Sequence, residues 1–157
     1  MKGLESLDWA NDPINELRQG YKSQRASIAH YSASDVAIEE VEFSSGIGLK
    51  FIPALLSSDT DILYFHGGGW IVGSPWTHKT LCSWMAKSTG QRVFAAPYNL
   101  APEHKFPAQA NQAAEITNNF LNNRNKVILA GDSAGAAMAL WAADGVIEKS
   151  SIQGLVS

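Results

Sequence analysis

Residues 126–135 have the sequence KVILAGDSAG, in which a short apolar run leads to a serine between two glycines. The run predicts a buried β-strand, and the alanine-rich residues after it predict a helix from about Ala134 to Glu148. A G-x-S-x-G pentapeptide between a strand and a helix is the pattern of a nucleophile elbow, whose sharp turn exposes the serine hydroxyl above the end of the strand. Alone it is a weak signal, because a Gly-Ser turn with Asp132 or Ser133 as helix N-cap is the alternative.

A second glycine motif follows another short apolar run, DILYF at residues 61–65. This run predicts a buried strand, and it is followed directly by HGGGW at residues 66–70. Three consecutive glycines cost chain entropy, so they are expected where the backbone must approach a ligand closely and present its amides. The end of a parallel strand is also where α/β sheets bind ligands. The alternative is a flexible glycine loop that binds nothing.

Strands and helices alternate along the chain from residue 61 onward. The helical spacing of Leu81, Trp84, Met85 and Ser88 predicts a helix from about His78 to Ser88 with these residues on one face, and Gly90 ends it. Further elements are expected as a strand at 92–97, a helix that begins at Pro107, and a last strand at 152–156. Such alternation predicts an α/β fold with a mostly parallel sheet and helices on both faces.

The residues before position 61 have a different pattern. Asp12-Pro13 predicts the N-cap and first residue of a helix that continues to about Ile28. Alternating apolar residues then predict two strands of a hairpin, at 36–43 and 47–55. The alternation slips at Glu39-Glu40, which predicts a β-bulge, and Pro53 indicates a sheet edge or a strand end.

The composition argues against several classes of function. Twelve Lys+Arg against fifteen Asp+Glu give a formal net charge of -3, so we expect no nucleic-acid partner. No apolar run approaches the length that spans a bilayer, and the first residues lack the apolar segment of a signal peptide. The one cysteine, Cys82, fits a reducing compartment and a cytoplasmic location, and it is expected to be a small buried side chain. The spacings H-E-x-x-H and C-x-x-C do not occur, so neither a metal nor another cofactor is expected.

Three motifs in this order, HGGGW, YNLAPEHKFPA at residues 98–108 and GDSAG, resemble the hormone-sensitive-lipase-like esterases of the α/β-hydrolase fold. The resemblance implies that Ser133 is the nucleophile and that the amides of Gly68, Gly69 and Ala134 form the oxyanion hole. It also implies that residues 98–108 are a structural brace near the site. Residues 1–35 would be a variable N-terminal helical cap region, and 36–157 the N-terminal portion of an α/β-hydrolase domain.

Some positions around these motifs are open to more than one interpretation. Asn99 stands where many relatives carry arginine, and we expect it to affect local packing or polar bonding more than chemistry. Trp70, Trp76 and Trp84 are candidates to wall an acyl or alcohol pocket. For Trp76 and Trp84, a place in the core is an equally good prediction.

A serine esterase also needs a base and a carboxylate, which in this fold follow the serine in the chain. All four histidines, His30, His66, His78 and His104, precede Ser133. His66 is expected to fix the shape of the glycine loop, and His78 to begin a helix. The acids after Ser133 are Asp144 and Glu148, and both are expected inside the helix that follows the elbow, where neither suits a catalytic carboxylate. The sequence therefore predicts the N-terminal half of a longer hydrolase, truncated after the nucleophile helix.

The leading hypothesis is a serine carboxylesterase or lipase-like hydrolase of short-to-medium acyl esters, acting through an acyl-serine intermediate and inactive as this chain alone. One alternative is a non-catalytic homologue that binds a small molecule. Another is an amidase or peptidase with the same serine site. Because the strand at 152–156 would leave a sheet edge open, we expect a chain of low stability, or a second chain or swapped protomer that covers the edge.

Overall fold

The computed structural model describes residues 7–122, 124 and 126–157. Its helices are α1 (Ile14–Ser27), α2 (Lys79–Thr89), α3 (Ala108–Leu121) and α4 (Ala134–Gly145). Its strands are β1 (Val36–Phe43), β2 (Gly46–Pro53), β3 (Asp61–Phe65), β4 (Val93–Ala96), β5 (Val127–Gly131) and β6 (Ile152–Val156). Short 3-10 segments are η2 (Ala29–Tyr31), η3 (Trp76–His78) and η4 (Lys149–Ser151). The alternation of strand and helix predicted from residue 61 onward is confirmed.

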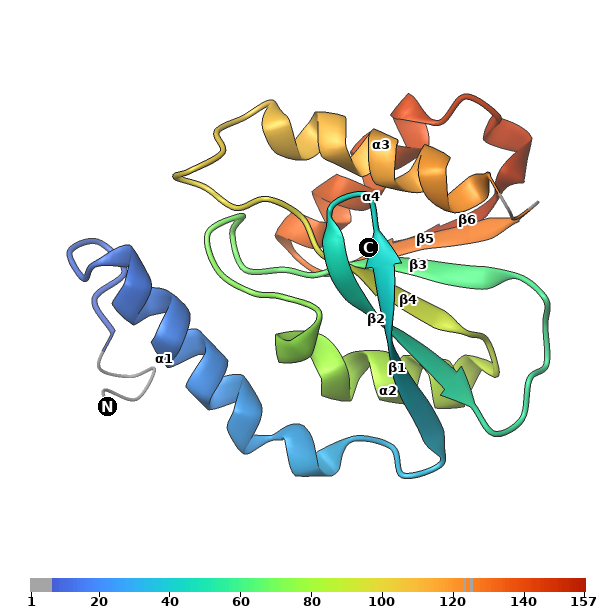
Figure 1. Ribbon diagram of the computed structural model, residues 1–157, viewed down its shortest axis with the longest axis horizontal. Coiled ribbons are helices and arrows are strands. Elements are labelled where there is room, and N and C mark those ends of the chain that lie inside the picture. Colours follow the sequence, from blue (N-terminus) through green and yellow to red (C-terminus); the bar gives the residue numbers. More distant parts are fainter. Residues whose placement is uncertain (1–6, 123, 125) are drawn as a thin grey trace.

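Within the described residues, one sheet joins the strands in the order β1-β2-β4-β3-β5-β6. Strand β3 pairs in parallel with β4 and β5, and β5 pairs in parallel with β6. The β1–β2 hairpin is antiparallel and joins the sheet where β2 pairs with β4. Figure 1 shows α3 and α4 on one face of the sheet and α2 on the other. The predicted α/β fold, with a mostly parallel sheet and helices on both faces, is confirmed.

The core is divided between the two faces of the sheet. Leu63 and Phe65 of β3 pack into the cluster that contains residues of α3 and α4. Their neighbours Ile62 and Tyr64 pack into the cluster that contains residues of α2. Every residue of β3 is buried, because successive side chains of a strand point to opposite faces and both faces are covered.

The β1–β2 hairpin has an unbroken register along its whole length, so the bulge predicted at Glu39-Glu40 is wrong. The slip in the apolar alternation has a different cause. Val36 and Ile38 pack into the cluster beside α2, whereas Val41 and Phe43 pack against the cluster on the opposite face. Because the covered face changes along β1, the apolar positions change from even to odd without an inserted residue.

The side chains that helix α2 buries are the small ones of Cys82, Ser83 and Ala86. The face that carries Leu81 and Trp84 is not the buried one, because these side chains are 45% and 46% exposed. Small side chains allow the helix to lie close to the sheet, and the large ones flank the contact instead of filling it. The prediction that Cys82 is buried is confirmed.

Helix α4 ends at Gly145, earlier than predicted. The side chain of Asn118 on α3 donates to the Gly145 carbonyl (3.2 Å) and accepts from the Ile147 amide (3.1 Å). These bonds hold the chain as it leaves the helix, so Glu148 lies outside α4, which corrects its expected place inside the helix. Its carboxylate instead accepts from the Ser150 amide at the start of η4.

Helix α1 lies to one side of the sheet (Figure 1). It contacts the short segments η2 and η3. Its N-cap is Pro13, not Asp12 as predicted, and it has no side-chain cap. The Asp12 carboxylate instead accepts from the Asp8 amide (2.8 Å). Pro53 ends β2, in agreement with its expected place at a strand end. Among the described residues, the helices are too short or too polar to cross a membrane.

The buried position of β3 gives a direct test of this core. Leu63→Ala removes a fully buried side chain, so we expect it to lower the free energy of unfolding by about 2–5 kcal/mol. Leu140→Ala, on the exposed side of α4, is the matched control, and we expect a change within about 0.5 kcal/mol. Urea denaturation measures both. Equal effects of the two substitutions would contradict the placement of β3.

Candidate active site

The serine of the GDSAG motif occupies a strained turn between β5 and α4. Ser133 has φ 54° and ψ -118°, in a region that residues other than glycine rarely adopt. Its side chain is exposed, whereas the next two residues are buried. Ala134 is the first residue of α4, and its amide lies in the first helical turn, where backbone N–H groups have no partner within the helix.

The two glycines of the motif allow α4 to approach the sheet. A Cβ at Gly135 would lie 2.0 Å from the Phe65 carbonyl oxygen at the end of β3. A Cβ at Gly131 would lie 2.2 Å from the Gly135 carbonyl oxygen. Both obstacles are backbone atoms and cannot rotate away, so glycine is required at both positions. The contact sets the serine turn beside the carboxyl end of β3, where the HGGGW loop begins.

The HGGGW loop is a tight backbone turn. Gly68 has φ 122° and Gly69 has φ 61°, and Trp70 shares the positive φ at 59°. The Gly68 carbonyl accepts from the amides of Ile71 (3.1 Å) and Val72 (3.0 Å). Within the described part of the chain, the amides of Gly68 and Gly69 donate to no backbone carbonyl. A Cβ at Gly69 would meet no atom within 4 Å, so this part of the loop borders open space.

The Asp132 carboxylate joins the serine turn to the glycine loop. Its Oδ1 accepts from the Gly67 amide (2.8 Å) and from the Tyr64 hydroxyl. The same oxygen lies 3.6 Å from Nε2 of His78, whose side chain is almost fully buried. One carboxylate oxygen therefore holds the loop, a strand and the start of α2 at fixed positions around Ser133.

The contacts around Asp132 keep its carboxylate ionised. Partial burial raises the pKa of Asp132, but the contacts with His78 and Tyr64 outweigh it and hold that pKa below its usual range. Burial raises the pKa of Tyr64, so its hydroxyl keeps the proton that it donates to Asp132. The junction therefore joins an ionised carboxylate to the Tyr64 hydroxyl and the Gly67 amide, and hydrogen bonds to an ionised acceptor are stronger than those between neutral groups.

His66 supports the glycine loop from behind. Its Nδ1 lies 2.9 Å from the Gly67 carbonyl, and its ring stacks on Tyr98 with 4.2 Å between centroids. The Tyr98 hydroxyl donates to the His66 carbonyl (2.6 Å). Burial lowers the pKa of His66 to about 4, so the imidazole is neutral and its Nδ1–H donates to Gly67. This geometry agrees with the expected role of His66 in fixing the loop.

Residues 98–108 connect the loop to α1. Arg18 of α1 donates to the carbonyls of Ile71 (2.9 Å) and Ala101 (2.9 Å) and makes two 2.7 Å contacts with Glu103. The Ala101 amide in turn donates to the Trp70 carbonyl (2.7 Å). The guanidinium lowers the pKa of Glu103 to about 2, so the pair is charged at neutral pH. The segment has the geometry of the brace that the sequence predicts.

Asn99 takes part in the same brace through its backbone. Its amide donates to Oε1 of Gln112 (2.7 Å), and its carbonyl accepts from Nε2 of Gln109 (3.1 Å). Gln109 is buried and also donates to the His104 carbonyl (2.6 Å). Because backbone atoms make these bonds, they do not depend on the side chain at position 99, and its expected effect on packing or polar bonding stays a prediction.

The three tryptophans near the loop have different surroundings. Trp70 is partly buried, with its ring centroid 5.8 Å from that of Trp141. Trp76 is 45% exposed and lines a hollow of about 420 Å³ between α1 and the chain after the glycine loop. Trp84 is exposed and donates to the Tyr31 carbonyl (2.7 Å). The alternative that Trp76 and Trp84 lie in the core is wrong.

The histidines do not complete a catalytic triad. His66 and His78 are buried behind the loop and Asp132, and His30 lies in η2. Across the described residues, Ser133 Oγ makes no hydrogen bond to any histidine or carboxylate. Sequence reasoning gave His78 no role beyond a helix start and did not single out Tyr64 or Arg18. The described residues also hold no cluster of three or more histidine, cysteine, aspartate or glutamate side chains suited to a metal ion.

A strained serine between a parallel strand and a helix, beside a glycine loop at the neighbouring strand, defines a hydrolase-type serine site on an α/β sheet. The family described as the alpha/beta hydrolase fold matches residues 62–157. The chain belongs to this family, and its motifs and structural neighbours are those of the hormone-sensitive-lipase-like esterases.

Individual proteins extend this result. The chain is 34% identical over 140 residues to an ethyl acetate hydrolase of Pseudomonas putida, which covers 80% of this chain and 44% of that protein. It is 39% identical over 84 residues to an acetyl-hydrolase of Streptomyces hygroscopicus, covering 52% of this chain and 28% of that one. A hormone-sensitive lipase from a metagenome library superimposes with a TM-score of 0.80 and 28% identity, covering 92% of this chain and 50% of that structure. The chain therefore spans half or less of these relatives.

Asp132→Asn tests the charged junction, because it keeps the side-chain shape and removes the charge. A folded-state pKa below the ordinary value means that the carboxylate stabilises the fold above about pH 4, the unfolded pKa of aspartate, and that this stabilisation is lost as the pH falls further. We expect the variant to be less stable than the wild type at pH 7, with the difference shrinking in more acidic solution.

Urea denaturation between about pH 3 and pH 7 measures this difference. Asp144→Asn is the control, because that side chain is 95% exposed and no shift of stability is expected. A difference between wild type and Asp132→Asn that stays constant over the whole pH range would contradict the charged junction.

Proposed function

We propose that this chain carries the nucleophile and the oxyanion hole of a serine-type carboxylic ester hydrolase. The proposal rests above all on one observation: a strained, exposed Ser133 lies beside a glycine loop that Asp132 Oδ1 holds through the Gly67 amide. A binding module has no need of a strained serine. Backbone strain of this kind persists where the surrounding structure enforces it, as at active sites.

In the proposed reaction, Ser133 Oγ attacks the ester carbonyl and gives up its proton to a base. The carbonyl oxygen becomes an oxyanion, which the amides of Gly68, Gly69 and Ala134 would stabilise. The oxyanion then collapses, the bond from the carbonyl carbon to the alcohol oxygen breaks, and the base returns its proton to the departing alcohol. Water, losing a proton to the same base, attacks the acyl-serine, and Ser133 Oγ takes that proton back as the acid leaves. Loss of one such donor costs about 3–4 kcal/mol of transition-state stabilisation in serine hydrolases.

We propose that the base and its carboxylate are contributed by residues other than these 157. The support is that all four histidines precede Ser133 in the sequence and that neither of the buried ones contacts its hydroxyl. In this fold the carboxylate and histidine follow the nucleophile in chain order. On this proposal, the 157 residues alone do not turn over ester.

For the substrate, we propose short acyl esters, acetyl esters first among them. The relatives that match with 33–39% identity include an ethyl acetate hydrolase, an acetyl-hydrolase and acetyl esterases. Hydrolysis of an ester by a serine nucleophile needs no cofactor, and the proposed reaction uses none. Amides would react at the same serine, so an anilide substrate belongs in the test.

We further propose that residues 1–35 are a cap over the site and that 36–157 belong to the hydrolase domain. Arg18 of α1 bonds to the loop carbonyl of Ile71 and to the brace at Glu103, which supports a cap seated beside the serine. A hollow next to Trp76 lies between α1 and the chain that follows the glycine loop. The unpaired Cys82 favours a cytoplasmic location.

The outer edge of the sheet leads to a related proposal. Among the described strands, β6 pairs with β5 alone, and Leu155 and Val156 are 37% and 57% exposed. We propose that further strands or a second protomer cover this edge in the working protein. An uncovered apolar edge would promote aggregation.

Ser133→Ala is the central test of the proposed function. We expect the protein purified from its native source to hydrolyse p-nitrophenyl acetate and to take one fluorophosphonate label, both of which the variant loses. Ser150→Ala, in η4, is the control and keeps both. Intact mass spectrometry locates the label. Full activity of Ser133→Ala would overturn the proposal, and hydrolysis of the anilide alone would replace esterase by amidase.

Gly68→Ala tests the oxyanion hole. A Cβ there would lie 2.2 Å from the Val72 carbonyl oxygen, so the loop must shift and misplace its amides. We expect kcat for p-nitrophenyl acetate to fall by about a hundredfold or more. Gly154→Ala on β6 is the control, because its Cβ meets ordinary contacts at 3.8 Å. An unchanged kcat in Gly68→Ala would remove this loop from the proposed reaction.

A further inference from the structure

The opposite end of the parallel strands carries a second cluster of charged residues. Asp61 begins β3, Arg92 immediately precedes β4, and Lys126 immediately precedes β5. Together with Arg124 and Asp59 they line a hollow of about 550 Å³. Asp61 and Phe65 lie at the two ends of β3, about 13 Å apart at 3.3 Å per residue, so this hollow is separate from the serine site.

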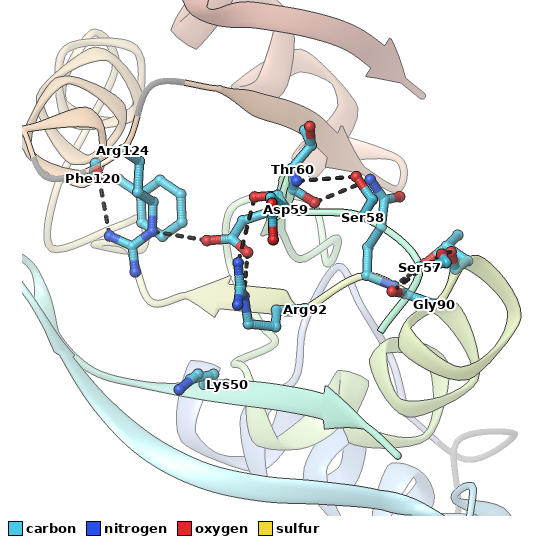
Figure 2. A network of polar contacts seen from close by, with 12 residues as sticks. Lys50, Ser57, Ser58, Asp59, Thr60, Gly90, Arg92, Phe120 and Arg124 are labelled. Carbon is cyan, nitrogen blue, oxygen red and sulfur yellow. Dashed lines mark hydrogen bonds and ion pairs between the residues drawn. The ribbon is translucent and has the colours of Figure 1, made fainter. Parts of the chain in front are cut away.

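Two arginines share the buried carboxylate of Asp61. Arg92 Nε donates to Oδ1 (2.5 Å), and Arg124 Nε donates to Oδ2 (2.9 Å). Figure 2 shows Arg92 and Arg124 with the contacts that their guanidinium groups make. Asp61 is only 4% exposed, so it needs a cationic partner to be tolerated inside the fold. One arginine would neutralise the Asp61 carboxylate. The second arginine therefore gives the group of Asp61, Arg92 and Arg124 a surplus positive charge.

The guanidinium groups are held in place and keep donors to spare. Arg124 lies 3.9 Å from the ring centroid of Phe120 and donates Nη1 to the Phe120 carbonyl (3.2 Å). Arg92 places Nη2 3.4 Å from the Asp59 carbonyl. Each guanidinium has five N–H groups, and the bonds to Asp61 use one from each. The arginine side chains are 28% and 30% exposed, so their remaining donors can reach a ligand.

The charge balance of the hollow favours an anion. Arg92, Arg124 and Lys126 supply three positive charges, and Asp59 and Asp61 supply two negative ones, in a chain whose formal net charge is -3. Among the described residues, Lys126 makes no ion pair. The hydroxyl groups of Ser58 and Thr60 in the wall add neutral hydrogen-bonding groups.

We propose that this hollow is a binding site for a phosphate-type oxyanion, either inorganic phosphate or a small phosphomonoester. Two ordered guanidinium groups with free N–H donors match the geometry of phosphate oxygens, and Lys126 adds a third positive charge. The proposal is independent of ester hydrolysis, because no residue of the serine site takes part in it.

The test uses NMR of the purified ¹⁵N-labelled protein at constant ionic strength, with the backbone amides of Thr60 and Arg92 as reporters. Inorganic phosphate and phenyl phosphate are titrated separately, with sodium chloride as the reference. We expect saturable changes in the chemical shifts of these amides with phosphate and with phenyl phosphate, and no such changes with chloride. The relative affinities of the two probes show whether free phosphate or a phosphomonoester is the better ligand.

Two charge-matched variants make the result specific. Lys126→Gln removes an exposed cation from the wall without disturbing Asp61, and we expect at least tenfold weaker binding. Lys149→Gln, in η4, removes the same charge elsewhere and should leave the affinity unchanged. Equal weakening in the two variants would mean attraction by overall charge only. That result, or the absence of saturable shifts up to about 20 mM phosphate, would overturn the proposal.

Discussion

The contact between the Asp132 carboxylate and the Gly67 amide joins two segments that are 65 residues apart in the chain. Each of the two segments has local contacts of its own, and this bond fixes the serine turn relative to the glycine loop. Because Oδ1 also accepts from Tyr64 and faces His78, the same oxygen fixes the positions of β3 and α2 relative to the loop. The geometry proposed for the oxyanion hole depends on this junction, although Asp132 itself is not assigned to the reaction.

The junction is possible only because α4 lies close to the sheet. Gly135 contacts the Phe65 carbonyl at a distance that leaves no room for a side chain. This contact sets the start of α4 against the end of β3, which brings Asp132 to Gly67 and Ser133 to the edge of the loop. The main role of the glycines in the GDSAG motif is therefore to let α4 pack closely on the sheet. The strained φ of Ser133 is the conformational cost of placing a helix so near the preceding strand, and the buried clusters on the two faces of the sheet provide the stability that offsets it.

The fold was predictable because its signals are local. Buried parallel strands produce short apolar runs, and glycine motifs follow β3 and β5 directly, so the elements and their order can be inferred from neighbouring residues. The contacts of the site are not local. Arg18 reaches Glu103 across 85 residues, and Tyr64 reaches Asp132 across 68, and no spacing rule connects such positions. The buried face of α2 was not predictable from periodicity for a related reason, since periodicity selects large apolar residues, whereas a helix close to a sheet buries small ones.

A carboxylate lies beside each end of β3, and the two carboxylates are stabilised by different kinds of contact. Asp132, beside the carboxyl end, is partly exposed, and the backbone and side-chain donors that hold it outweigh the cost of its partial burial. Asp61, at the amino end, is buried, and hydrogen bonds from neutral groups would not compensate its charge there. The fold instead supplies two arginines, one more cation than neutralisation requires. The surplus positive charge is fixed and partly exposed to solvent, and this imbalance distinguishes the amino-end hollow from an ordinary structural ion pair.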